Sequence, residues 1–482
     1  MAYGAAAGTA ALLIVQASCG CAIMRSMVMP HCARRLSLPL LSLLVLLVGS
    51  PSVSMRLLAQ AAAPNRIDTV APMAPELAPY GSHDIGVRTL RVTDPQRIDV
   101  LKTSAGAPPV RSDRTLVIEA WYPAQVPPGT PRTGTYDALV RDGRTRVTLH
   151  GRAVREAPPE AGLFPLVILS HGYPGTRYLM SHLGENLASK GYVVVSIDHT
   201  DSTYDQQLAF ASTLYNRSLD QLFVLKAVAG LAAAGSGDPL AGHVDVSRVG
   251  LVGYSMGGYG VVNTIGGGYA DAATVLPTAP PNGLLRDRAA SNPGYRASRD
   301  ARIRAAVAIG PWGMQAGFWD AAGLAGIEIP TLFVAGSADE VSGYEKGTQA
   351  MFEGAINADR YLLTFADAGH NAAAPYPAPR EAIEGPAQAA FGHHADPVWD
   401  TVRMNNILQH FTTAFFGQHL KGDAGMQSYL TVVPQGRAGV WAVDREGTPQ
   451  PAHTYWKGFK RGTALGLSLE HRTPAPARSP GQ

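Results

Sequence analysis

The sequence predicts a doubly wound α/β sheet that is mostly parallel, and two observations carry this prediction. Strand-like apolar runs recur along the chain with helical patterns between them. Several of these runs are continuous rather than alternating, as expected of strands that are buried on both faces. The predicted strands are Arg88–Val92, Thr115–Trp121, Leu166–Leu169, Val193–Ile197, Val249–Gly253, Ile303–Ile309, Thr331–Ala335 and Tyr361–Phe365.

Helical periodicity is found between and after these strands. One helix carries leucines four residues apart and ends before Gly191, and a second follows the fourth predicted strand. A third, near the end of the chain, is a long helix with one apolar face. The apolar positions are Leu179, Leu183 and Leu187, then Leu222, Leu225 and Val228, then Met404, Ile407, Leu408, Phe411 and Phe415.

Length and composition bound the domain organisation. The chain has 482 residues, of which 46% are hydrophobic, so a large core is available and global disorder is excluded. We expect a leader over residues 1–61, then an N-terminal strap with the first strand over 62–110. A catalytic α/β domain follows over 111–425, with insertions near 266–300 and 371–397. A C-terminal extension covers 426–482, and its Pro-rich tail from Arg472 is expected to be disordered.

The first sixty residues are typical of an export signal. The apolar run Leu36–Gly49 follows Arg34 and Arg35, as an h-region follows a charged n-region, and small residues at Ala59–Ala61 suit cleavage. The run is shorter than the roughly 20 residues that a spanning helix needs. We therefore expect an exported protein, periplasmic or extracellular, with no stable membrane span after cleavage. An uncleaved N-terminal anchor is the alternative.

Charge and cysteine content exclude several classes of function. All three cysteines, Cys19, Cys21 and Cys32, fall inside the predicted leader, so the mature protein would have no disulfide, no thiol nucleophile and no Cys-ligated metal. Lys and Arg total 40 against 37 Asp and Glu, which does not indicate a nucleic-acid partner. We expect neither a metal nor a cofactor.

The candidate nucleophile is Ser255 in the pentapeptide Gly253–Gly257, which fits the pattern G-x-S-x-G. A buried-strand run precedes it and the helix-compatible stretch Gly258–Ile265 follows, which is the strand–turn–helix context of a nucleophile elbow. Glycines flank the serine because side chains at those positions would clash across the sharp turn. The alternative is a Gly-rich turn that carries an inert serine.

The partners of Ser255 follow in the order acid, then base. Asp339 comes after the strand Thr331–Ala335, and His370 comes after the next strand, so both lie at the carboxyl edge where ligands bind in open sheets. His370 would accept the serine proton, and Asp339 would orient the imidazole. Glu340 is the rival for the acid.

His393 and His394 are the rivals for the base, although no strand precedes them. The oxyanion hole would use the backbone N–H groups of Tyr173 and Met256, with Gly172 competing with Tyr173 for the first donor. His171, in the same loop, is expected to pack as a structural residue.

From about Arg88 to Leu420 these motifs resemble the α/β-hydrolase superfamily. The loop Ser170–Gly175 followed by Gly191–His199, together with a Trp-Tyr-Pro strand, is similar to the platelet-activating-factor acetylhydrolase and dienelactone-hydrolase-like group. True dienelactone hydrolases use a cysteine nucleophile. Ser255 departs from that pattern, so lactone specificity is not carried over.

A second resemblance is to bacterial cutinases and polyester hydrolases. It rests on Gly172-Tyr173 before a helix, on the elbow Tyr254–Gly258, and on Pro311-Trp312 after a strand. In that family the tryptophan lines the acyl pocket, so the resemblance implies that Trp312 and Gly172 bind substrate. The long insertions and the lack of a disulfide are departures that bear on whether the cleft is open to a polymer.

These features together predict an exported serine carboxylic-ester hydrolase that acts through an acyl-enzyme on short- to medium-acyl esters. Tyr173, Met256 and Trp312 would form an apolar pocket floor, and the substrate would be a small-molecule or lipid ester. The alternatives are a polyester or cutinase-like hydrolase, a phospholipid acetylhydrolase, and a catalytically silent hydrolase fold that only binds. The sequence does not determine the oligomeric state.

Overall fold

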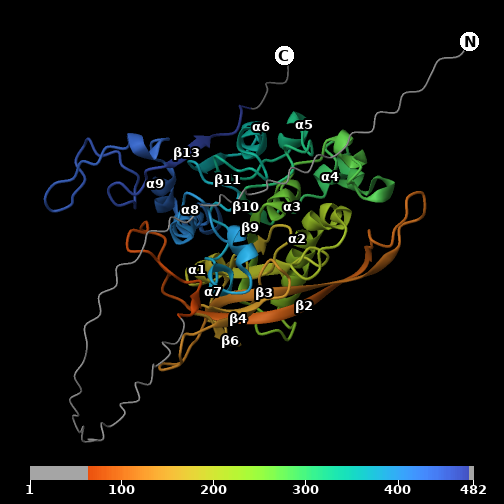
Figure 1. Cartoon of the computed structure of the whole chain (residues 1–482), viewed down its shortest axis with the longest axis horizontal. Coiled ribbons are helices and arrows are strands. Elements are labelled where there is room, and N and C mark those ends of the chain that lie inside the picture. The colour runs from red at the N-terminus through yellow and green to blue at the C-terminus, as the bar shows by residue number, and fades with distance from the viewer. Residues whose placement is uncertain (1–62, 477–482) are drawn as a thin grey trace, which may run out of the picture. The chain divides into compact units, whose positions relative to one another are not determined.

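The computed structural model describes residues 63–476, and a ten-stranded sheet forms the centre of this part of the chain (Figure 1). Strands β7 to β12 are parallel, whereas β2, β3 and β13 join the sheet through antiparallel pairings. In sheet order the strands are β13 (Leu467–Arg472), β12 (Arg360–Phe365), β11 (Thr331–Gly336), β10 (Ile303–Ile309), β9 (Val244–Tyr254), β7 (Phe164–Ser170), β8 (Val193–Asp198), β3 (Arg111–Ala124), β2 (Asp84–Ile98) and β6 (Val154–Arg155). Every strand predicted from the sequence lies within one of these.

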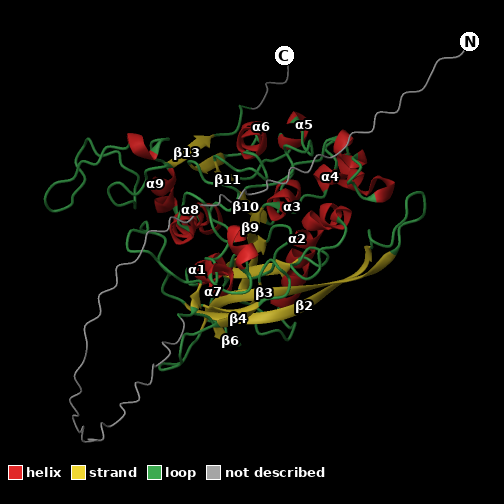
Figure 2. Cartoon of the chain, viewed as in Figure 1, coloured by secondary structure: helices red, strands yellow, loops and turns green. Residues whose placement is uncertain are grey.

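Helices cover both faces of the sheet (Figure 2). α1 (Ser181–Ala188) and α8 (Thr401–Lys421) pack on one face, and α2 (Phe210–Ala232) and α3 (Met256–Thr264) pack on the other. Neighbouring residues of β7 show this division, because Val167 lies in one core with Leu183 of α1 while Leu166 lies in the other with Leu225 of α2. The predicted doubly wound α/β sheet is confirmed.

The insertions contain only short elements. Within 266–300 there are two 3₁₀ segments and α4 (Pro293–Ala297), and within 371–397 there are α7 (Arg380–Ile383) and a 3₁₀ segment, Gln388–His393. Elsewhere in the described residues the short α-helices are α5 (Ala321–Leu324), α6 (Ala350–Gly354) and α9 (Gln427–Leu430), and there are also a π-helical segment, Tyr344–Gln349, and two 3₁₀ segments, Ala424–Met426 and Gly436–Ala438.

Two parts of the architecture differ from the sequence analysis. A separate three-stranded sheet, in the order β1 (Asn65–Arg66), β5 (Arg146–His150), β4 (Thr135–Leu139), was not predicted. At the other end, Arg472 was predicted to begin a disordered tail, and this is wrong. It is the last residue of β13 and pairs with Arg360, because the buried Leu467 and Leu469 hold β13 against β12.

The predicted leader with its three cysteines, and residues 477–482 of the predicted tail, lie outside the described residues. Their predictions are therefore untested. None of the helices within 63–476 has the length and apolar character needed to cross a membrane.

Candidate active site

Ser255 stands on the sharp turn between β9 and α3. Its φ of 53° is positive, a backbone conformation that is strained for a residue with a side chain. The turn is held in place because the Ser255 N–H donates to the Ile309 carbonyl of the neighbouring strand β10, at 2.9 Å, and the Ser255 carbonyl accepts from the Trp312 N–H at 3.1 Å. The side chain is thereby presented at the carboxyl edge of the sheet.

The steric reason for the two flanking glycines is visible in the packing. A Cβ placed on Gly257 would lie 1.9 Å from the carbonyl oxygen of Ser170, and one placed on Gly253 would lie 2.3 Å from the carbonyl oxygen of Gly257. Both neighbours are main-chain atoms, which cannot rotate away. The elbow therefore tolerates only glycine at these two positions.

His370 and Asp339 lie beside Ser255 although they come from distant parts of the sequence. The His370 Nε2 is 2.9 Å from the Ser255 Oγ, and its Nδ1 is 2.9 Å from the nearer Asp339 carboxylate oxygen. Because Nδ1 faces a carboxylate it carries the proton, so Nε2 is free to accept the serine hydroxyl proton. Asp339 is itself oriented by the backbone N–H groups of Val341 and Ser342, at 2.9 and 2.8 Å.

The rival residues occupy different positions. Glu340 is exposed and lines the cavity in front of Ser255, and none of its hydrogen bonds within residues 63–476 reaches His370. His393 hydrogen-bonds Arg141 and Tyr204 instead of the serine, and His394 is buried against the Tyr376 ring. The geometry therefore brings together Ser255, Asp339 and His370, and none of the three rivals.

The backbone amides predicted to bind an oxyanion make no hydrogen bond within the described part of the chain. Met256 is the first residue of α3 and Tyr173 follows β7, and within residues 63–476 neither N–H donates to an acceptor of the chain. Gly172, the competing candidate, packs directly against the elbow, since a Cβ there would lie 3.2 Å from the Ser255 Cβ. The buried Arg217 holds this loop because its guanidinium donates to the carbonyls of His171 and Gly172.

A cavity of about 320 Å³ opens onto the serine, which is near the lower end of the range for ligand pockets. Its wall includes the Tyr254 ring, which lies against the His370 ring with a centroid separation of 5.1 Å. The lining residues are Arg141, Gly172, Tyr173, Tyr254, Ser255, Glu340, Val341, His370, Asn371, Ala389, Gly392 and His393.

The predicted pocket floor is only partly present. Tyr173 lines the cavity, but Met256 and Trp312 are not among the lining residues. The Met256 side chain is buried, and Trp312 packs edge-on against Phe210, whose ring in turn contacts Tyr173 at a centroid separation of 5.4 Å. Trp312 therefore supports the wall from behind because Phe210 stands between it and Tyr173.

Sequence reasoning missed Arg141 and Asn371 as cavity residues. Arg141 lies in the turn after β4, in the unpredicted small sheet, so nothing in the local pattern pointed to the site. Asn371 directly follows His370 and accepts a hydrogen bond from the Tyr254 hydroxyl at 2.9 Å. Its place beside the candidate base was the one signal that could have identified it.

A second hydrogen-bonded arrangement of Ser, His and Asp, made of Ser170, His199 and Asp220, lies buried next to the Ser255 triad. The Ser170 Oγ is 2.8 Å from the His199 Nε2, and the His199 Nδ1 is 3.0 Å from Asp220. All three side chains are almost fully inaccessible, and Ser170 does not line the cavity at Ser255. Burial lowers the pKa of His199 to about 4, with Arg217 adding to this effect. We interpret this buried arrangement as a structural support for the loop after β7.

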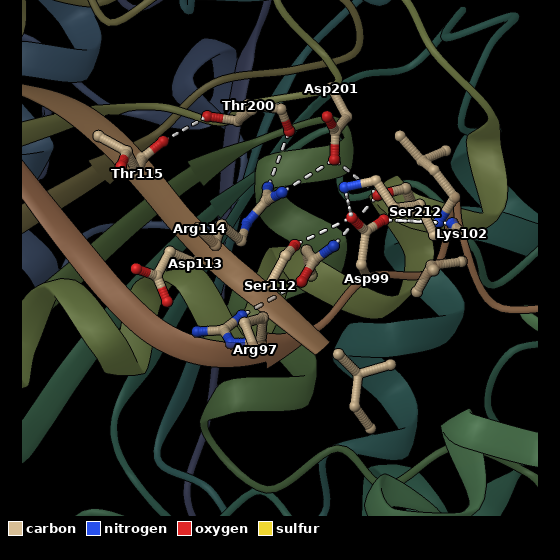
Figure 3. Close-up of a pocket in the computed structure, with 14 residues that line it drawn as sticks. Arg97, Asp99, Lys102, Ser112, Asp113, Arg114, Thr115, Thr200, Asp201 and Ser212 are labelled. Atoms are coloured by element: carbon tan, nitrogen blue, oxygen red, sulfur yellow. Dashed lines mark hydrogen bonds and ion pairs between the residues drawn. The ribbon is translucent and has the colours of Figure 1, made fainter. Parts of the chain in front are cut away.

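A second cavity, of about 290 Å³, is lined by Arg114 and Asp201 among others (Figure 3). Its cations are already paired, since Arg114 bonds Asp201 at 2.8 Å and Asp220 at 2.9 Å, and Lys102 bonds Asp99 at 2.9 Å. Burial opposes ionisation of Asp220, but Arg114 and His199 outweigh it and hold the Asp220 pKa well below its usual value. We interpret the charged residues that line this cavity as a structural network of ion pairs.

The part of the chain that the structure describes holds no group of three or more His, Cys, Asp or Glu side chains placed to bind a metal ion. The arrangement at Ser255 instead consists of a hydroxyl, an imidazole and a carboxylate joined by hydrogen bonds. Such an arrangement can carry out acyl transfer.

Comparisons with known proteins agree with this geometry. A family model described as PET hydrolase-like matches residues 151–284, which include Ser255. Cutinase est1 of Thermobifida alba is 27% identical over 38% of this chain and 46% of its own length, and cutinase 2 of Thermobifida cellulosilytica is 32% identical over 26% and 42%. The bis(hydroxyethyl) terephthalate hydrolase of Streptomyces coelicolor is 24% identical over 43% and 51%. The chain thus spans about half the length of the curated relatives it matches.

A ferulic acid esterase from Streptomyces cinnamoneus has a similar structure, with a TM-score of 0.51 and 23% identity over 75% of this chain and 94% of that one. The chain has an α/β-hydrolase fold with similarity to cutinases. The fold class and the resemblance to α/β-hydrolases and cutinases, predicted from the sequence, are confirmed.

Proposed function

We propose that this protein is a serine carboxylic-ester hydrolase in which Ser255, His370 and Asp339 carry the reaction. The observation that supports this most is the pair of 2.9 Å contacts that joins the three side chains at the floor of an accessible cavity. The cutinase relatives and the PET hydrolase-like match agree with an ester substrate. The complete triad argues against a silent binding protein.

The proposed reaction proceeds in two halves. The Ser255 Oγ attacks the ester carbonyl carbon while the His370 Nε2 takes its proton, and collapse of the tetrahedral intermediate breaks the bond to the alcohol, which leaves with that proton. Water, deprotonated by His370, then attacks the acyl-enzyme and releases the acid. Each turnover consumes one water molecule and regenerates the serine.

The amides of Tyr173 and Met256 would stabilise the oxyanion in both halves. They are suited to this role because neither is used within the described chain and both belong to main-chain segments held by neighbouring hydrogen bonds. Removing one such donor typically costs about 3–4 kcal/mol of transition-state stabilisation. Asp339 would contribute by holding His370 in the required tautomer.

The substrate is proposed to be a small ester with a short to medium acyl group. The cavity of about 320 Å³ is walled by the turn after β4 and by the 371–397 insertion, which favours a small molecule over a polymer chain. Polyester hydrolysis is the second candidate, favoured by the similarity to cutinases and to the terephthalate-ester hydrolase. A phospholipid acetylhydrolase activity stays a prediction from the sequence resemblance.

We also propose that the protein is exported, on the basis of the charged and apolar pattern of residues 1–61. N-terminal sequencing of the secreted protein would test this. Cleavage close to Ala61 supports export, whereas a retained N-terminus in a membrane fraction indicates an anchor.

The proposed mechanism is tested by covalent labelling together with turnover. The purified protein should hydrolyse p-nitrophenyl acetate and butyrate, and a fluorophosphonate probe should modify the peptide that contains Ser255, as identified by mass spectrometry. A polyester film incubated in parallel decides between the two substrate candidates, because release of soluble acid from the film would favour the second. Absence of both turnover and labelling in a folded protein would exclude a serine hydrolase.

A further inference from the structure

The cavity in front of Ser255 contains a cation that the proposed reaction does not use. Arg141 lines this cavity and is solvent-exposed, and within residues 63–476 it forms no ion pair with a carboxylate. Glu340, the lining residue of opposite charge, belongs to the loop of Asp339. Within the described residues it does not form an ion pair with Arg141. Neutral esters have no need of a guanidinium in this cavity that faces no carboxylate.

The position of Arg141 is built by the small sheet. Arg141 follows β4 in a tight turn in which Asp142 accepts hydrogen bonds from the amides of Arg144 and Thr145, at 2.9 and 2.8 Å. Gly143, with a φ of +68°, packs on the Tyr204 carbonyl so closely that a Cβ would lie 2.5 Å from that oxygen. The turn is therefore held against the main domain.

The Arg141 side chain is oriented by the 371–397 insertion. Its Nη1 is 2.7 Å from the His393 Nδ1, and the His393 Nε2 is 2.7 Å from the Tyr204 hydroxyl. Burial holds the pKa of His393 well below its usual value, with His394 and Arg141 adding to the effect, so the ring is neutral and its Nδ1 accepts a hydrogen bond.

This leaves most of the guanidinium available to a ligand. Arginine has five N–H donors, and within the described chain Arg141 uses one of them, toward His393. The planar fork of a guanidinium matches the two oxygens of a carboxylate and binds them bidentately. A small ester held at Ser255 that also carries a carboxylate could reach Arg141 within the same cavity.

We propose that Arg141 is a specificity-determining residue that selects esters bearing a free carboxylate, such as half-esters of dicarboxylic acids. This inference rests on the proposed ester-hydrolase function and names its substrate class. His393 and Tyr204 are positioning residues for the guanidinium, and Glu340 disfavours a carboxylate in the part of the cavity beside the Asp339 loop.

The test compares esters that differ only in a free or blocked carboxylate. Monoethyl and diethyl esters of succinate, adipate and suberate place the carboxylate on the acyl side, and 4-acetoxybutanoate with its ethyl ester places it on the alcohol side. The measured quantity is the ratio of kcat/KM for the anionic ester to that for its neutral partner, counted per ester bond for the diethyl esters and by acetate release for the 4-acetoxybutanoate pair. Arg141→Gln is compared with Arg144→Gln, which removes the same charge from the same turn but lies outside the cavity.

The wild-type protein should prefer the anionic member of at least one pair, and Arg141→Gln should lower that ratio about tenfold, chiefly through KM. Glu340→Gln should raise the ratio, and Arg144→Gln should leave it unchanged. The inference is overturned if the ratio is the same in the wild type and in Arg141→Gln for every pair of esters. It is also overturned if the ratio falls equally in Arg144→Gln. If the neutral esters are hydrolysed in that case, the proposed function still stands. If no ester of either kind is hydrolysed, both are overturned.

Discussion

This molecule contains two hydrogen-bonded Ser–His–Asp arrangements, which leads to a sharp prediction about which serine reacts. Both arrangements have hydrogen-bond distances of 2.8–3.0 Å, so the distances alone do not show which serine is reactive. Solvent access distinguishes the two serines, because Ser255 lines the cavity whereas Ser170 is 0% exposed. Replacing each serine by alanine should therefore affect different properties of the protein.

Ser255→Ala removes the attacking oxygen, and the loss of kcat should be on the order of 10⁶-fold, as for other triad nucleophiles. Its thermal stability should change little. Ser170→Ala leaves the buried Nε2 of His199 without its donor, which should lower the free energy of unfolding by about 1–3 kcal/mol. With an unfolding entropy of about 0.9 kcal/mol/K for a domain of this size, the expected fall in Tm is about 1–3 °C.

The activity of Ser170→Ala should stay within about tenfold of the wild type, because Arg217 still holds the carbonyls of the loop after β7. The assay is initial-rate hydrolysis of p-nitrophenyl acetate, with calorimetric melting of the same preparations. Loss of activity in Ser170→Ala comparable to that in Ser255→Ala would show that access does not decide which serine acts. Retained activity in Ser255→Ala would remove the proposed nucleophile.

Three further outcomes are expected. His370→Ala should lower kcat on the order of 10³-fold or more, and His393→Ala by less than about tenfold, so initial rates of the two variants show which histidine is the base. Gly257→Ala should cost about 3 kcal/mol or more in urea unfolding, because its Cβ would lie 1.9 Å from a main-chain oxygen, while Gly230→Ala, with open space around it, serves as the matched control. Acid should destabilise the fold through His199, whose pKa falls from 6.5 to about 4 on burial. Between these pH values the unfolded chain binds a proton that the folded chain does not. The contribution of His199 to the free energy of unfolding, about 3 kcal/mol above pH 6.5, is therefore lost as the pH falls. The melting temperature of the wild type should depend more steeply on pH than that of His199→Gln.

The sequence by itself determined the parts of this protein that depend on local patterns. Continuous apolar runs identified the central strands since a strand buried on both faces has no polar side. The elbow was readable because steric exclusion around Ser255 acts over a few residues and requires glycine at both flanking positions. The candidates Asp339 and His370 followed because strand ends in a parallel sheet meet at one edge.

Only the tertiary structure decided which side chains share the cavity. Arg141 and His393 are 252 positions apart and meet because the small sheet and the 371–397 insertion both fold over the same edge, and no local pattern encodes that meeting. The placement of Trp312 behind Phe210, and of Arg472 in an edge strand, likewise depends on neighbours that are remote in sequence. Periodicity and turn chemistry are short-range properties of a chain, whereas the contents of a pocket are set by packing between segments that meet only after the chain has folded.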